Sequence, residues 1–163
     1  MDLRTLLLSG DYQYEGDAPA AESSIVALVA ATPVPLPSEY VELLRLSDGG
    51  EAHMTGHPGY VRIWSALKAI ENNRDYEVEK WLPGFIGFGD NGGPEMVGFD
   101  TRSGPPFRVC SVMFAPMEWE GAMGDVPNFG VFIRQLLKQG QSADPDSADG
   151  PADVVADDVK SAD

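Results

Sequence analysis

Residues 85–100 read FIGFGDNGGPEMVGFD, and this stretch decides the fold. Ile86 and Phe88 stand two positions apart, and two apolar residues repeat this spacing beyond the central turn. A period of two is typical of β-strands, because successive side chains point to opposite faces of a sheet. The glycines in the centre readily adopt the positive φ angles of tight turns. We therefore predict a hairpin of two paired strands, over residues 85–89 and 95–100.

The same stretch contains the spacing Gly-x-Gly-x-x-Gly, from Gly87 to Gly92, which also occurs in nucleotide-binding loops. In those loops a helix begins within the motif, and its N-terminal amides meet a phosphate. Here Pro94 and the glycines before it would break such a helix, and no basic residue lies between Lys80 and Arg102. The spacing therefore indicates a turn between strands and not a nucleotide site.

Two helices are predicted before this hairpin. The first covers residues 19–31, where apolar residues recur three and four positions apart, and a run of prolines ends it. The second lies in the segment LPSEYVELLRLSDGG, residues 36–50, because Pro37 favours a helix start and two glycines supply a left-handed cap at the end. Its apolar stripe consists of Leu36, Tyr40, Leu43 and Leu44.

The segments between this helix and the end of the sheet are shorter. Residues 51–60 have the composition of a loop, and residues 61–64, VRIW, favour a strand. Ser65 can cap a brief helix over residues 66–71. After the hairpin, the runs FRVC and SVMFAPM, residues 107–117, can extend the same antiparallel sheet.

The last predicted element is a helix that Asn128 caps and that ends just before Gly140. Helices at both ends with strands between them predict an α+β fold, in which N-terminal and C-terminal helices flank an antiparallel sheet. The apolar face of the last helix consists of Phe129, Phe132, Ile133, Leu136 and Leu137.

We expect one globular domain over residues 1–140 and an acidic tail over residues 141–163. The chain has 163 residues and is 43% hydrophobic, which is enough for one sizeable core. The tail has seven Asp, one Lys and no aromatic residue. Its few apolar groups and its self-repulsion leave little to offset the entropy of ordering a backbone, about 1–2 kcal/mol per residue. The composition therefore predicts a disordered tail.

Charge limits the classes of partner. The chain carries 26 acidic and 11 basic residues, a formal net charge of −15. Such a field repels phosphate backbones and anionic lipid and attracts cations, so we predict a basic protein as the partner, and neither nucleic acid nor membrane. No stretch reaches the roughly 18 apolar residues of a membrane span, and the start has no signal-peptide pattern. We expect a soluble, cytoplasmic protein, whose oligomeric state does not follow from these residues.

A small metal-dependent or thiol enzyme is an alternative in a different class. His53 and His57 lie four positions apart, but glycine and proline around them favour a loop, and the chain has no third histidine. Cys110 is the only cysteine and lies in a strand-like run. A nucleophilic thiol needs a cationic or helix-terminal neighbour that lowers its pKa from about 8.5. We therefore predict no metal site, and a buried structural role for the cysteine.

Several motifs in sequential order resemble the SUKH superfamily of the Smi/Knr type. LPSEYVELLRLSDGG is similar to its Leu-Pro, helix and Asp-Gly-Gly signature, and VRIWSALKAI is similar to its strand, tryptophan and short helix. LPGFIGFGDNGGPEMVGFD resembles its glycine-rich hairpin, and NFGVFIRQLL its C-terminal helix, with Asn128 in place of the usual serine. The resemblance covers about residues 20–139, and neither residues 51–60 nor the acidic tail has a counterpart in it.

The resemblance implies an α+β domain that binds proteins and has no catalytic residue, cofactor or metal. Bacterial members resemble immunity proteins that neutralise toxin domains, often nucleases, of polymorphic or contact-dependent systems, and fungal members resemble regulatory scaffolds. We therefore expect an immunity protein, with a regulatory scaffold as the alternative. The residues that carry the resemblance are expected in the core: Leu36, Pro37, Tyr40, Trp64, Phe129 and Phe132.

The candidate contact residues fall into two groups that we expect to be exposed. One lies in the hairpin turn, and the other places a tryptophan between two carboxylates, where it can anchor on a basic partner. Glu118 and Glu120 are also expected on one side of a strand, a spacing that an acid and base pair can use. The candidates are Asp90, Asn91, Glu95, Glu118, Trp119 and Glu120.

Overall fold

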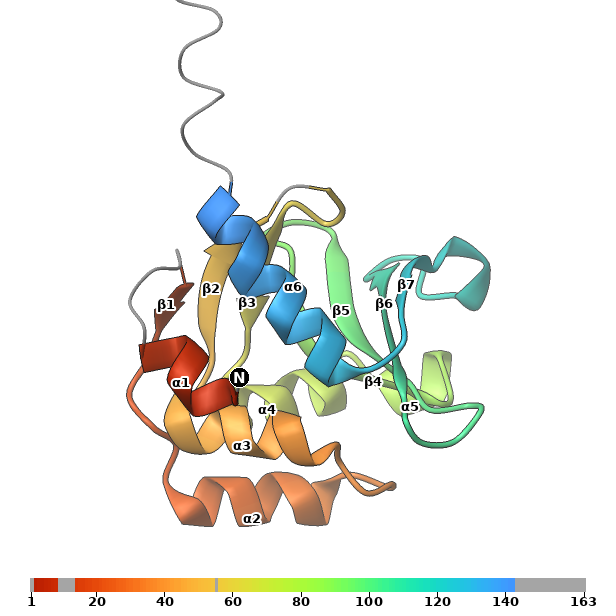
Figure 1. The fold of residues 1–163 in the computed structure, drawn as a ribbon. Coiled ribbons are helices and arrows are strands. Elements are labelled where there is room, and N and C mark those ends of the chain that lie inside the picture. The colour runs from red at the N-terminus through yellow and green to blue at the C-terminus, as the bar shows by residue number, and fades with distance from the viewer. Residues whose placement is uncertain (1, 9–13, 55, 143–163) are drawn as a thin grey trace, which may run out of the picture.

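A computed structural model of the protein describes residues 2–8, 14–54 and 56–142. The centre of the fold is a seven-stranded sheet in which the strands follow one another in chain order and all neighbours are antiparallel (Figure 1). The strands are β1 (Tyr14–Gly16), β2 (Gly50–His53), β3 (Tyr60–Ile63), β4 (Phe85–Asp90), β5 (Glu95–Asp100), β6 (Arg108–Met113) and β7 (Met123–Val126).

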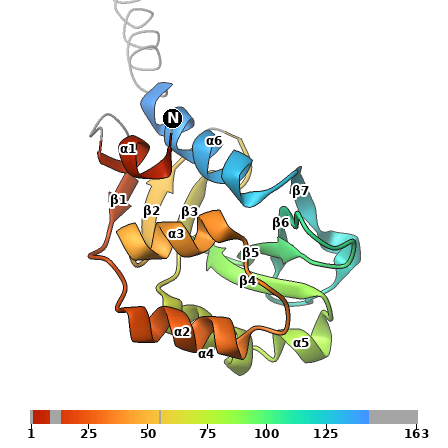
Figure 2. The ribbon, with the colours of Figure 1, turned by 60° about the horizontal axis from the view of Figure 1, so that its bottom comes forward.

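Helices pack against this sheet from both parts of the chain. The C-terminal helix α6 (Phe129–Ser142) lies across one face of the sheet (Figure 1). Three helices gather along one side of the molecule: α2 (Glu22–Ala31), α3 (Ser38–Leu46) and α4 (Ala66–Asp75) (Figure 2). The fold is therefore α+β, as the sequence predicts. The remaining helices are α1 (Leu3–Leu8), α5 (Val78–Trp81) and the 3-10 helix η1 (Trp119–Gly121).

The ring of Phe88 on β4 is the centre of the core, and it has no exposed surface. Four aromatic rings surround it at centroid distances between 4.7 and 5.7 Å. Aromatic pairs of this kind contribute about 0.5–1.5 kcal/mol each beyond the area they bury. Phe88 therefore joins the sheet to a helix from each half of the chain. The four rings belong to Tyr40 of α3, Phe99 of β5, and Phe129 and Phe132 of α6.

The segment that follows α3 also fixes the start of α4. Asp48 Oδ1 accepts a hydrogen bond from the backbone N–H of Ala66 at 2.8 Å, and Ser65 caps the same helix with its side chain. Gly49 has a φ of 88°, and a Cβ at this position would collide with the backbone carbonyl of Ile63. The Asp-Gly pair thus ends one helix and positions the next, because it satisfies an N-terminal amide that would otherwise lack a partner.

A bulge in β4 depends on a side chain from α4. Pairing with β5 shifts by one residue between Gly87 and Gly89, which makes Phe88 the inserted residue. The ladder between β3 and β4 extends only as far as Gly89. At Gly87 the side-chain amide of Asn73 makes the hydrogen bonds that a neighbouring strand would otherwise make. Its Oδ1 accepts a hydrogen bond from Gly87 N at 2.9 Å, and its Nδ2 donates one to Gly87 O at 2.8 Å.

Most predicted elements are confirmed. The hairpin strands, the helix after Pro37, the helix that Ser65 caps and the helix that Asn128 caps are all present, and Val131 N donates to Asn128 Oδ1 at 2.9 Å. Cys110 is buried on β6, as expected. Among the residues expected in the core, Leu36 and Pro37 are only half-buried and the others are buried.

Several predicted boundaries are wrong: the first predicted helix begins at Glu22 and not at residue 19, and the helix that Ser65 caps ends at Asp75 and not at residue 71. Residues 51–60 are not one loop, because residues 51–53 belong to β2 and Tyr60 begins β3. Strands on both sides pair with β2, and Ala52 is buried, so the sheet orders a segment with little β-propensity of its own. The last helix does not stop before Gly140 but continues to Ser142. The rest of the predicted tail, residues 143–163, lies outside the described residues.

We predict that Asn73→Ala lowers the free energy of unfolding by about 2–3 kcal/mol, because the N–H and C=O of Gly87 lose their partner inside the protein. Urea denaturation followed by tryptophan fluorescence measures this loss. Asn72→Ala is the matched control, because the side chain of Asn72, next to Asn73 in the chain, makes no hydrogen bond within the described residues. Equal losses in the two variants would show that Asn73 does not support the bulge.

Candidate functional site

The first two candidate residues, Asp90 and Asn91, hold the hairpin turn. Asp90 accepts hydrogen bonds from Trp64 Nε1 and from Gly92 N, both at 2.7 Å. Asn91 Oδ1 accepts from the backbone N–H groups of Gly93, at 3.0 Å, and of Glu95, at 3.1 Å. Both side chains are half-buried, so the expectation that they are freely exposed is wrong. The turn uses them because its backbone amides lack partners within the hairpin ladder.

Glu95 is likewise engaged inside the protein, and its side chain is only 13% exposed. Its Oε1 accepts a hydrogen bond from Ser111 Oγ at 2.9 Å and lies 2.9 Å from His57 Nε2. The same ring nitrogen is 2.8 Å from Ser111 Oγ. A hydrolytic triad needs the carboxylate and the serine on different ring nitrogens, and here one nitrogen faces both. The cluster therefore ties residues 56–59 to the sheet and does not activate the serine.

The second group of candidates surrounds η1. Glu118 and Glu120 were expected on one side of a strand, and this is wrong, because residues 119–121 form a single 3-10 turn. The ring of Trp119 holds this turn: Arg102 Cζ lies 3.5 Å from its centroid, and Phe85 meets it edge-on at 5.8 Å. Trp119 is therefore half-buried, whereas Glu118 and Glu120 are exposed and form no ion pair within the described part of the chain.

The structure does not bring the two groups together. Trp119 contacts Phe85, the first residue of β4, whereas Asp90 is the last residue of that strand. Five residue steps in a strand span roughly 17 Å at about 3.3 Å per residue. The candidates thus lie near opposite ends of β4 and form two separate surfaces.

Neither of the enzyme alternatives finds support in the side chains. Burial raises the pKa of the Cys110 thiol to about 11, and the nearby carboxylate of Asp100 acts in the same direction, so the thiol is protonated at neutral pH. His53 packs against the ring of Tyr60, with centroids 5.1 Å apart, while His57 binds Ser111. Residues 2–8, 14–54 and 56–142 contain no group of three or more His, Cys, Asp or Glu side chains that could hold a metal.

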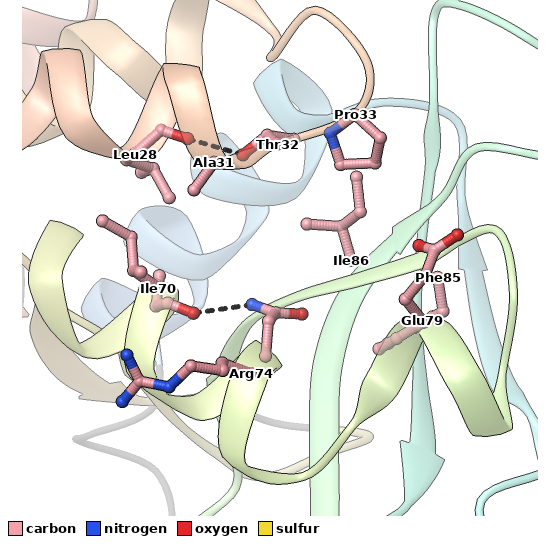
Figure 3. Close-up of a pocket in the computed structure, with 11 residues that line it drawn as sticks. Leu28, Ala31, Thr32, Pro33, Ile70, Arg74, Glu79, Phe85 and Ile86 are labelled. Carbon is pink, nitrogen blue, oxygen red and sulfur yellow. Dashed lines mark hydrogen bonds between the residues drawn. The ribbon is translucent and has the colours of Figure 1, made fainter.

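A pocket of about 340 Å³ opens between α2, α4, α5 and β4 (Figure 3). The side chains of Leu28, Ile70 and Ile86 surround it, and Arg74 lies at its edge (Figure 3). Its volume lies in the range of sites that bind small molecules or single side chains. Sequence reasoning missed this pocket, since it combines four elements that are up to about sixty residues apart in the chain. The sequence signal that could have indicated it is the apolar Ile70 on the helix that Ser65 caps.

These features define a class: a small α+β domain whose exposed surface carries acidic and apolar side chains and whose only cysteine is buried and protonated. No helix in the described residues has the length and apolarity needed to cross a bilayer. A sequence profile of the SMI1 / KNR4 family (SUKH-1) matches residues 19–135, which is most of the chain. The chain therefore belongs to this family. A comparison with curated proteins finds no match.

At pH 7 we expect the Cys110 thiol of the folded protein to react with iodoacetamide about a hundredfold more slowly than in concentrated guanidinium chloride, because its pKa rises from 9.0 to about 11. The folded state then favours the bound proton, so the free energy of unfolding decreases as the pH rises from about 9 to about 11. Mass spectrometry of the alkylated protein follows the reaction. Equal rates in the two states would restore the thiol-enzyme alternative.

Proposed function

We propose that this protein is an immunity protein: a non-catalytic domain that binds a basic, nuclease-like toxin domain and neutralises it. Membership of the SMI1 / KNR4 family (SUKH-1) is the observation that carries this proposal, because the resemblance described above implies a protein-binding module. The net charge of −15 supports a partner whose contact surface is positively charged. Nucleases bind phosphate backbones through basic surfaces, and an acidic protein is attracted to the same surfaces.

The proposal includes the place and mode of action. In this proposal the protein acts in the cytoplasm, where the toxin's nucleic-acid substrate is found. Because the net charge repels nucleic acid and anionic lipid, neither of these competes with the protein partner. Binding requires no cofactor and no metal in this proposal, since occlusion of the toxin's substrate surface is sufficient.

The exposed carboxylates beside η1 are the candidates of choice for long-range attraction. Glu118 and Glu120 are exposed, whereas Asp90, Asn91 and Glu95 bind groups of their own hairpin, the neighbouring strands or residues 56–59. Changing the hairpin residues would therefore alter the fold as well as the surface. In this proposal the hairpin end contributes its acidic field, and the η1 turn contributes charges that a partner can contact directly.

A co-expression experiment tests the function. Where a neighbouring gene encodes a protein that ends in a nuclease-like domain, we expect that cells producing this domain survive when they also produce the protein described here and die when they do not. A toxin domain of a different sequence class, expressed in the same way, is the control for general protection. Death of cells that contain both proteins at equal amounts would contradict the immunity role and favour the regulatory scaffold.

A charge-reversal experiment tests the η1 surface. We expect Glu118→Lys with Glu120→Lys to slow association with the toxin domain about tenfold at low salt and less at high salt, because screening removes the steering. Stopped-flow fluorescence at two salt concentrations measures the rates. Glu15→Lys with Asp17→Lys, at the opposite edge of the sheet, gives the same change in net charge and serves as the control. Identical rates for the two double variants would remove the η1 turn from the interface.

A further inference from the structure

Most of the strongly exposed apolar side chains belong to one set of neighbouring helices. Seven large hydrophobic residues of the described chain are strongly exposed, and five of them lie on α2, α4, α5 or the α4–α5 turn. Two of these are the aromatic residues Tyr76, 46% exposed, and Trp81, 58% exposed, and no other aromatic side chain of the described residues is as exposed. Trp and Tyr are the residue types most enriched at the centres of protein interfaces. The other three are Val26, Val29 and Leu67.

The pocket of Figure 3 lies among these same helices, and its chemistry selects an apolar occupant. Its two uncharged polar side chains are already bonded within the protein. Thr32 Oγ1 donates to the carbonyl of Leu28 at 2.7 Å (Figure 3). The side-chain amide of Asn73 binds Ala69 O and both backbone groups of Gly87. The charged side chains of Arg74 and Glu79, both exposed, also line the pocket, and the rest of its lining is apolar. An aliphatic side chain satisfies such a site.

Charged residues around the pocket determine which residues can flank the aliphatic side chain that a partner inserts. Glu77 and Glu79 are exposed, and neither enters an ion pair of the described residues, although Arg74 beside them pairs with Asp75 at 3.0 Å. Glu77 is also the only described residue other than glycine with a positive φ, at 53°. Lys80 Nζ lies 4.9 Å from the centroid of Trp81, so a cation of this chain already lies over the exposed indole, in a contact of the kind that a partner's Arg or Lys can also make.

We propose that the surface formed by α2, α4, α5 and their pocket is the docking site for the basic protein partner, which inserts an aliphatic side chain into the pocket and places Arg or Lys side chains against Trp81, Glu77 and Glu79. The identity of this partner as a toxin rests on the proposed function, whereas the location and chemistry of the surface do not. A second copy of the chain is disfavoured as the occupant, since two molecules of charge −15 repel each other.

The test uses a defined probe, the peptide acetyl-Arg-Leu-Arg-Lys-Leu-Arg-amide, titrated into the ¹⁵N-labelled full chain and followed by NMR. We expect the indole N–H signal of Trp81 and the backbone signals of Ile70 and Ile86 to shift in a saturable way. The same peptide with Glu at its four basic positions should cause no shift, and the one with Ala in place of both Leu should bind about tenfold more weakly. Shifts confined to residues outside α2, α4, α5 and β4, or no saturable shift, would overturn the proposal.

Matched variants locate the contact. Tyr76→Ala with Trp81→Ala should weaken peptide binding about tenfold, while Val131→Ala, which removes an exposed apolar side chain from α6, should not change it. Glu77→Gln with Glu79→Gln should weaken binding about threefold and reduce its dependence on salt. Urea denaturation of each variant excludes unfolding as the cause. Unchanged affinity in the Tyr76 and Trp81 variant would also overturn the proposal.

Failure of this proposal can be distinguished from failure of the proposed function. If the Tyr76 and Trp81 variant protects cells from the toxin domain as well as the unchanged protein does, the protein is an immunity protein that does not use this surface. A chain that binds the peptide at Trp81 but gives no protection has the surface described here and another partner.

Discussion

The packing of Phe88 is the constraint on which the rest of the structure depends. Its ring meets aromatic rings from α3, β5 and α6, and it reaches them from a bulge that makes it the extra residue of β4. The small residues on either side are required by the neighbours, because a Cβ at Gly87 would meet Met96 and one at Gly89 would meet the backbone of Arg62. The amide of Asn73 then completes the hydrogen bonding that the bulge and the departure of β3 leave open. Glycine spacing that resembles a nucleotide loop is thus explained by the packing of one ring.

This packing also decides which surfaces remain for recognition. Residues 85–89 of β4 are all buried, so the centre of the sheet offers no free face to a partner. What remains is the outer side of α2, α4 and α5 and the loops at the ends of the strands. Asp90 and Glu95 show how far the fold uses even these loops, because both carboxylates bind groups on other strands or loops. In the two proposals above, recognition therefore falls to exposed side chains that the fold does not need, among them Trp81, Glu118 and Glu120.

The sequence predicts the periodic elements well and the contacts poorly, for a physical reason. The hairpin, α3 and α6 have clear apolar periods and caps, which act over a few residues. The strand β2 has the sequence GEAH and forms because β1 and β3 pair with it, and neither pairing is visible locally. Whether a carboxylate is exposed or bonded also cannot be predicted from the local sequence. Asp90 binds Trp64, which is 26 positions away, and Glu95 binds Ser111, which is 16 positions away. Sequence reasoning expected Asp90 and Glu95 to be exposed, which is wrong, and it did not find the pocket beside α4.

The strict chain order of the sheet affects how the protein folds during its synthesis. Each strand pairs with the one made just before it, so no strand has to wait for a distant segment to leave the ribosome. Short connections join β2 to β3, β4 to β5 and β5 to β6 and keep the entropy of closing these pairings low, whereas two helices separate β1 from β2 and two more separate β3 from β4. Only the seating of α6 on the finished sheet needs the end of the domain. In the proposed immunity role, this topology lets the protein become competent soon after its synthesis, when a cell already exposed to a toxin needs it most.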